Sequence, residues 1–92
     1  MAALSPQEIS VHLTTVPAWH VEAGELTRIF QFEDFKGALR FVNKVAALAE
    51  DAGHHPDIDI RYNRVRLGLV THDAGGLTSK DFGLAAAIDK LL

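Results

Sequence analysis

The sequence predicts an α+β fold of two layers, in which a four-stranded antiparallel sheet carries three helices packed on one face. Apolar residues recur at helical spacing in three stretches, and each stretch begins with residues that can cap a helix. Between these stretches lie two pairs of short segments in which apolar and polar residues alternate around a turn. The resulting order, α-β-β-α-β-β-α, is typical of a sheet covered by helices on one side.

The first part of the chain contains a short helix and a hairpin. Ser5 can cap the helix, Pro6 suits its first turn, and Glu8 completes a capping box with Ser5. Two alternating segments then flank the pair Ala23-Gly24. Two such segments around a glycine-containing turn predict a β-hairpin, which supplies half of the sheet.

The strongest helical pattern follows Asp34, which can cap the first turn. It ends before Gly53, which suits the left-handed position after a helix. Glu50 lies at the negative end of the helix dipole, where cations are preferred, and one turn before His54. The spacing of the apolar residues predicts one buried face, made of Phe35, Ala38, Leu39, Val42, Val45, Ala46 and Ala49.

Residues 58–62 and 65–71 also alternate between apolar and polar, and they predict the second hairpin. Directly opposed residues of a hairpin are equidistant from its turn. A turn centred on Asn63-Arg64 therefore pairs Ile58 with Leu69. This register places apolar side chains on one face of the sheet, as a half-buried hairpin requires.

The same register carries a prediction about function. Continued past the strands, it places His55 opposite His72 and His54 beside Asp73. We therefore expect the three histidines His54, His55 and His72 to gather at the open end of the second hairpin.

The last helix follows a glycine-rich turn. Thr78 and Asp81 have the spacing of a second capping box. Ala85, Ile88 and Leu92 share one face of the predicted helix, which we expect to cover the sheet.

Composition limits the classes of function. A chain of 92 residues is long enough for one domain, which we expect to span residues 1–92. A net charge of −3 argues against binding to nucleic acid. No apolar run approaches the roughly 20 residues of a membrane span, and the start lacks the features of a signal peptide. The absence of cysteine fits a reducing compartment, so we expect a cytoplasmic protein.

The histidine cluster indicates acid–base chemistry. Histidine titrates near neutral pH, so two histidines can act as proton donor and proton acceptor in one site. A dehydration needs such a pair, because a leaving hydroxyl must be protonated while another proton is removed. The carboxylate of Glu50, Asp57 or Asp81 could fix the tautomer of a histidine.

Other interpretations stay open on the residues alone. Adjacent histidines occur by chance, and Asp81 is already explained by the capping box. Three histidines and a carboxylate are enough ligands for zinc. However, neighbouring residues of an extended segment point in opposite directions, so His54 and His55 are poorly placed to share one ion. Ser5 and Ser79 both belong to helix starts, which disfavours a serine nucleophile.

Three motifs resemble the pterin-4a-carbinolamine dehydratases. They are Glu50-x-x-x-His54-His55-Pro56, then Tyr62-Asn63-x-Val65, then Thr71-His72-x-x-x-Gly76-Leu77-Thr78-x-x-Asp81. The resemblance covers most of the chain and includes Trp19 and the helix start Asp34-Phe35. The combined spacing is far more specific than the His-His-Pro motif alone.

The resemblance implies an activity. It is the dehydration of 4a-hydroxytetrahydrobiopterin to quinonoid dihydropterin and water, a step of tetrahydrobiopterin recycling, without metal or cofactor. It implies that His54 and His72 are the main acid–base residues, and that His55 assists them and helps to bind the pterin. The rest of the expected substrate-binding set is Glu50, Pro56, Asp57, Thr71 and Asp81. Where the family often has tryptophan, this chain has Ile58, which leaves open any pterin packing that uses that aromatic ring.

The resemblance also implies a homodimer or homotetramer, since the family forms both. Animal members of the family double as transcriptional coactivators. The alternative to an enzyme is therefore a non-catalytic dimerisation module that keeps the fold, and the sequence leaves this alternative open.

Overall fold

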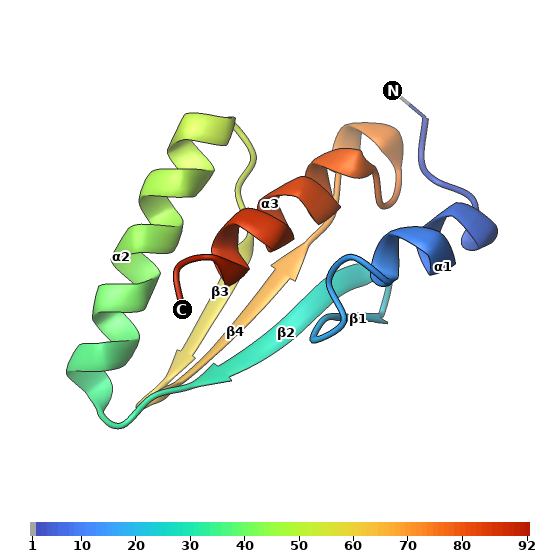
Figure 1. The fold of residues 1–92 in the computed structure, drawn as a ribbon. Coiled ribbons are helices and arrows are strands. Elements are labelled where there is room, and N and C mark those ends of the chain that lie inside the picture. Colours follow the sequence, from blue (N-terminus) through green and yellow to red (C-terminus); the bar gives the residue numbers. More distant parts are fainter. Residues whose placement is uncertain (1) are drawn as a thin grey trace.

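A computed structural model describes residues 2–92 of the chain (Figure 1). The three helices and four strands occur in the predicted order, so the predicted α+β fold is confirmed. The elements are α1 (Pro6–Leu13), β1 (His20–Glu22), β2 (Glu25–Gln31), α2 (Phe35–Ala52), β3 (Asp57–Arg61), β4 (Arg64–Leu69), the 3-10 turn η1 (His72–Ala74) and α3 (Ser79–Asp89).

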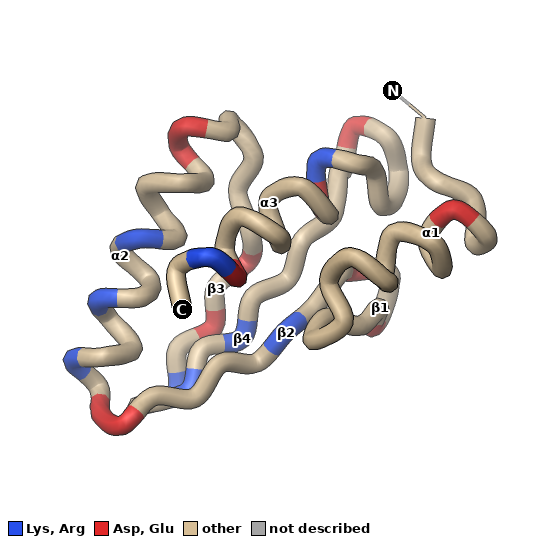
Figure 2. Tube along the Cα trace, in the orientation of Figure 1, with Lys and Arg blue, Asp and Glu red and all other residues tan. Residues whose placement is uncertain are grey.

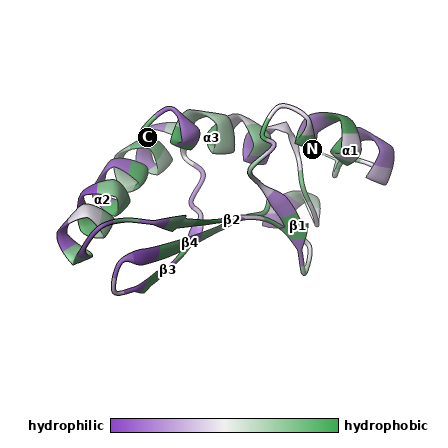
Figure 3. Ribbon diagram, turned by 60° about the horizontal axis from the view of Figure 1, so that its bottom comes forward, coloured by the Kyte–Doolittle hydropathy of each residue, from purple (hydrophilic) through white to green (hydrophobic). Residues whose placement is uncertain are grey.

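The four strands form one antiparallel sheet in the order β1-β2-β4-β3. The two hairpins therefore join through their second strands, and β4 lies between β2 and β3. All three helices lie on the same side of the sheet, and its other face is open (Figure 3). This arrangement confirms the predicted two layers.

The core fills the space between the sheet and the helices. Val65, Leu67 and Leu69 of β4 are fully buried, because β4 is central and these side chains face the helices. Burying one such side chain contributes about 1.5–3 kcal/mol. Trp19 is also buried, and its indole Nε1 donates a hydrogen bond to Asp89 Oδ1 over 2.9 Å.

The predicted helix caps are confirmed. Glu8 Oε1 accepts from the Ser5 backbone N–H over 2.8 Å, and Ser5 Oγ accepts from the Glu8 N–H over 3.2 Å. Asp34 Oδ1 accepts from the Gly37 N–H over 2.8 Å. Gly53 ends α2 with a φ of 61°, in the left-handed region that glycine adopts at low cost.

The predicted buried face of α2 is partly wrong. Phe35 and Leu39 remain 45% and 36% exposed, whereas Phe41 is buried with its ring centroid 4.6 Å from that of Phe30. The apolar stripe is wider than one contact with the sheet can cover. The helix turns Ala38, Phe41, Val45 and Ala49 inward and leaves Phe35, Leu39 and Ala46 on an adjacent exposed strip.

The predicted register of the second hairpin is wrong by two residues. Ile58 pairs with Leu67 rather than with Leu69, because the turn is made by Tyr62-Asn63. Tyr62 adopts a φ of 53°, which is uncommon for a residue other than glycine, asparagine or aspartate. An even shift keeps each side chain on its predicted face of the sheet. Leu92 was predicted on the buried face of the last helix. It lies instead beyond the end of α3 and is 64% exposed.

Candidate active site

His54 is positioned by the end of α2. After the left-handed Gly53, the His54 backbone N–H donates to Ala49 O over 3.1 Å, which turns the chain toward the start of α3. There His54 Nε2 lies 2.6 Å from Asp81 Oδ1. The His54 side chain is 13% exposed and that of Asp81 is fully buried, so little water competes for this hydrogen bond.

Asp81 joins three segments of the chain. Its Oδ2 accepts from the Thr78 backbone N–H and from Thr71 Oγ1, both over 2.9 Å, while Oδ1 faces His54. Because Thr71 has a single hydroxyl hydrogen, Thr78 Oγ1 donates the bond of 2.8 Å between the two hydroxyls. Asp81 thus caps α3, as the sequence predicts, and also holds the His54 ring.

This network assigns the tautomer of neutral His54. The Asp81 carboxylate accepts hydrogen bonds, so Nε2 of His54 carries the hydrogen and Nδ1 is left able to accept a proton. A buried carboxylate that orients an imidazole in this way is a recurring part of general-base sites.

His55 is held differently from His54. Its Nε2 lies 2.5 Å from Glu50 Oε2, but the two side chains are 63% and 78% exposed. An ion pair that is so exposed contributes about 0–1 kcal/mol. Glu50 therefore orients His55 at the rim of the site and adds little to stability.

All three histidines line one hollow of about 280 Å³. His54 and His55 come from the end of α2, and the exposed His72 comes from η1 after β4. The direct opposition of His55 and His72 is not observed, because the register is shifted and η1 turns the chain. The complete lining is Gly53, His54, His55, Val70, Thr71, His72, Asp73 and Lys80.

Two of the remaining predicted site residues, Thr71 and Asp81, lie in or directly behind the hollow, and two, Pro56 and Asp57, do not. Thr71 lines the hollow, and Asp81 lies behind His54. Pro56 does not line the hollow. Asp57 points to the open face of the sheet, where its carboxyl group hydrogen-bonds with that of Glu25. No sequence pattern singles out Glu25, because its nearness to Asp57 depends on β4 lying between β2 and β3.

The carboxyl pair has an electrostatic consequence. The hydrogen bond to Asp57 raises the pKa of Glu25 above its ordinary value of 4.5, and burial and the charge of Asp57 act in the same direction. Arg66 and His72 oppose this rise in the pKa of Glu25. A hydrogen bond between two carboxyl groups requires a proton on one of them, so Glu25 keeps its proton to higher pH than a lone glutamate.

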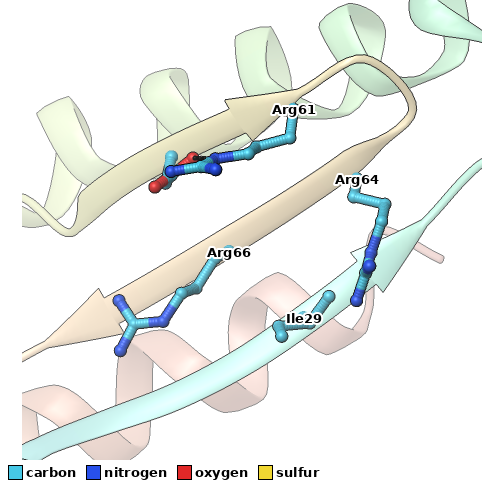
Figure 4. A pocket seen from close by; sticks show the side chains of 5 residues that line it. Ile29, Arg61, Arg64 and Arg66 are labelled. Carbon is cyan, nitrogen blue, oxygen red and sulfur yellow. Dashed lines mark hydrogen bonds and ion pairs between the residues drawn. The ribbon is translucent and has the colours of Figure 1, made fainter.

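A different hollow lies at the far end of the second hairpin. Figure 4 shows Arg61, Arg64 and Arg66 around Ile29 on the open face of the sheet, in a hollow of about 250 Å³. Figure 2 shows basic residues near the β3–β4 turn, away from the end that carries the histidines. This hollow is lined by charged residues and contains no histidine.

Two further observations concern residues 2–92. Within this range no three His, Asp or Glu side chains gather closely enough to hold a metal ion. None of the helices in the same range combines the length and the apolar character needed to cross a membrane.

Comparisons with known proteins agree with the site. Residues 2–91 match the family model for pterin 4 alpha carbinolamine dehydratase. The chain is 63% identical over 92 residues to a protein of Acidobacterium capsulatum and 61% identical over 93 residues to one of Chloroflexus aggregans. Both relatives bear the name "Putative pterin-4-alpha-carbinolamine dehydratase". The matches cover all of this chain and 100% and 99% of the two relatives.

Solved structures give the same family with more varied descriptions. A transcriptional coactivator/pterin dehydratase from Brucella melitensis superposes with a TM-score of 0.91 at 33% identity, covering 97% of each chain. A pterin dehydratase-like protein, described as a RuBisCO assembly factor in the alpha-carboxysome, gives a TM-score of 0.65 at 26% identity, covering 79% of this chain and 84% of that one. The chain belongs to the pterin-4-alpha-carbinolamine dehydratase family.

Proposed function

We propose that the protein dehydrates 4a-hydroxytetrahydrobiopterin to quinonoid dihydropterin and water, using histidines as general acid and general base, within tetrahydrobiopterin recycling. The observation that carries this proposal is the hollow that His54, His55 and His72 share, together with the buried Asp81 behind His54. Membership of the family supports the choice of a pterin carbinolamine as substrate.

The reaction divides between two histidines. The C4a–O bond breaks as His72 donates a proton to the departing hydroxyl, which leaves as water. The N5–H proton passes to Nδ1 of His54, and the electrons of the N5–H bond form the C4a=N5 double bond. The assignment of His54 as base is supported by its hydrogen bond to Asp81, which leaves Nδ1 as the proton acceptor.

The rim residues bind the substrate. A hollow of about 280 Å³ is near the lower limit of small-molecule pockets, which suits a compact bicyclic ring. In our proposal His55, oriented by Glu50, lies against the pterin, Thr71 lines its site, and Pro56 shapes the site indirectly by restricting the backbone of His55. No cysteine is present, which is compatible with the cytoplasm, where we place the reaction.

We also propose that the protein works as a homodimer or homotetramer. The exposed strip of α2 supports this proposal, because Phe35 and Leu39 would be covered by the same strip of a second copy. Ile58 and Ile60 on the edge strand β3 are 39% and 38% exposed, and a second edge strand would cover them.

One experiment distinguishes the hypothesis of an enzyme from that of a non-catalytic module. Dehydration of 4a-hydroxytetrahydrobiopterin is compared among the wild type, the double variant His54→Ala/His72→Ala and the control Arg64→Gln, with the spontaneous reaction as baseline. We expect acceleration by the wild type and by the control, and its loss in the double variant, with the oligomer unchanged in all three. A double variant as fast as the wild type would exclude the proposed catalysis.

The module remains the second candidate, and one observation favours it. The structural relatives are described as a coactivator/dehydratase and as an assembly factor, so members of this fold are associated with protein partners. In that case the substitutions at His54 and His72 would leave both partner binding and assembly intact.

A further inference from the structure

Glu25 occupies an unusual place on the open face of the sheet. Gly68 pairs with Thr27 of β2 on one side and with Asp57 of β3 on the other, so these three residues form one row across the sheet. The Glu25 side chain lies over Gly68, so closely that a Cβ added there would be 2.7 Å from Glu25 Oε1. The missing side chain of Gly68 therefore lets Glu25 reach Asp57.

Glu25, one member of the carboxyl pair, lies near His72, whose charge lowers the pKa of Glu25. Glu25 and His72 line a second hollow, of about 460 Å³, together with residues of the β1–β2 turn and of the glycine turn after η1. His72 also lines the hollow that holds His54 and His55. It thus stands between the proposed substrate site and the carboxyl pair.

We propose that Glu25 is a positioning residue of the acid–base site, which with Asp57 holds one proton beside His72 and returns it to His72 between turnovers. This inference rests on the proposed function. In each turnover His72 gives a proton to the leaving hydroxyl and His54 receives one from N5. The carboxyl pair reprotonates His72 and is refilled from water, while His54 releases its proton to water, so protons balance.

The arrangement explains why two hollows meet at His72. A pterin in the first hollow covers the side of His72 from which the proton is given. The second hollow stays open, so a proton can be restored from the side of Glu25. The other charged groups around Glu25 are Arg66 of β4, 3.9 Å away, and Glu22 of β1, which lies 4.0 Å from Arg66. They set the local charge and do not line the second hollow.

The kinetic test uses Glu25→Gln, in which the amide can still donate to Asp57 but cannot deliver a proton. We expect turnover to fall about tenfold at unchanged KM, less than the 10²–10⁴-fold effect of a group that transfers a proton to substrate directly. Buffer acids small enough to enter the second hollow should restore the rate. Glu22→Gln, which keeps the neighbour Arg66, is the matched control and should turn over like the wild type.

Gly68→Ala provides a second variant. Its methyl group displaces the Glu25 carboxyl without changing any charge, so it should reproduce the loss and the rescue by buffer. Turnover of Glu25→Gln equal to that of the control, or a loss that no buffer restores, would overturn the proposal.

A second readout does not depend on activity. The titration of the Glu25 side-chain carboxyl carbon is followed by NMR in the wild type, His72→Ala and Asp57→Asn. Because the charge of His72 lowers the pKa of Glu25 and the bond to Asp57 raises it, the two substitutions should shift the Glu25 titration in opposite directions. Absence of a shift in His72→Ala would overturn the coupling even if dehydration is confirmed. Opposite shifts without dehydration would instead locate the failure in the proposed function.

Discussion

At the scale of single residues, Asp81 decides which nitrogen of His54 is free. In Asp81→Asn the side-chain carbonyl must keep facing the Thr78 N–H, so the amide NH₂ faces His54. His54 Nε2 then has to accept, and its hydrogen moves to Nδ1, the nitrogen that should act as base. We expect turnover to fall by about 10²–10⁴-fold in this variant, measured as the dehydration rate.

The control for this substitution is Asp89→Asn. Asp89 also accepts hydrogen bonds from two side chains, Trp19 and Arg28, but it lies at the end of α3, away from the histidines. The control should lose stability and keep its turnover. Full turnover in folded Asp81→Asn would contradict the role assigned to His54.

Glu25 makes a prediction about stability at the same scale. The folded protein holds the Glu25 proton to higher pH than the unfolded chain, because the pKa of Glu25 is raised above 4.5. The resulting stabilisation is complete below the unfolded pKa and is lost as the pH rises through the folded one. Urea unfolding from about pH 4 to about pH 8 should therefore show wild type losing stability relative to Glu25→Gln as the pH rises. A difference independent of pH would contradict the shared proton.

The residues show where sequence reasoning reached its limit. The hairpin pattern was sufficient to predict that His54, His55 and His72 gather at one end of the second hairpin, although its register was wrong, and the capping-box spacing marked Asp81 as a cap. The sequence offered Glu50, Asp57 and Asp81 as partners of a histidine but did not show that Asp81 holds His54, because that contact joins residues 27 positions apart. Asp57, which the resemblance assigns to substrate binding, lies beside Glu25, and this nearness depends on the strand order.

At the scale of elements, the end of α2 and the middle of α3 give opposite predictions for the same substitution. Gly53→Ala forces alanine into a left-handed conformation and should cost about 1–2 kcal/mol of unfolding free energy. Gly83→Ala lies inside α3 with nothing within 4 Å of the new Cβ, so it should stabilise by about 0.5–1 kcal/mol. Denaturant unfolding of both variants tests this pair. Equal effects would contradict the assigned ends of the helices.

Elements were predicted better than their contacts. Caps, periodicity and turns were sufficient to identify seven elements and the layers, because each signal is local. The predicted register of the second hairpin was wrong because Tyr62 occupies a turn position with a positive φ, which a tyrosine rarely adopts. The prediction of the buried face of α2 failed in part because periodicity marks apolar positions without showing which of them the sheet covers.

At the scale of the whole molecule, the exposed strip of α2 predicts association. Leu39→Glu places a charge at the centre of this strip and should convert the proposed oligomer into a smaller species, measured by sedimentation. Lys36→Gln, one turn earlier on the same helix, changes the net charge by the same amount and is the control; it should leave the assembly unchanged, because Lys36 does not belong to the apolar strip. Identical sedimentation of Leu39→Glu and the wild type would contradict an interface at this face.

The central claim is that the histidine hollow dehydrates a pterin carbinolamine. The most direct measurement is the rate of 4a-hydroxytetrahydrobiopterin dehydration, followed by ultraviolet absorbance, for the wild type and for His72→Ala against the spontaneous reaction. We expect the wild type to accelerate the reaction and His72→Ala to lose most of that acceleration, since we propose that His72 supplies the proton for the leaving hydroxyl. A folded wild-type protein that leaves the spontaneous rate unchanged would contradict the account.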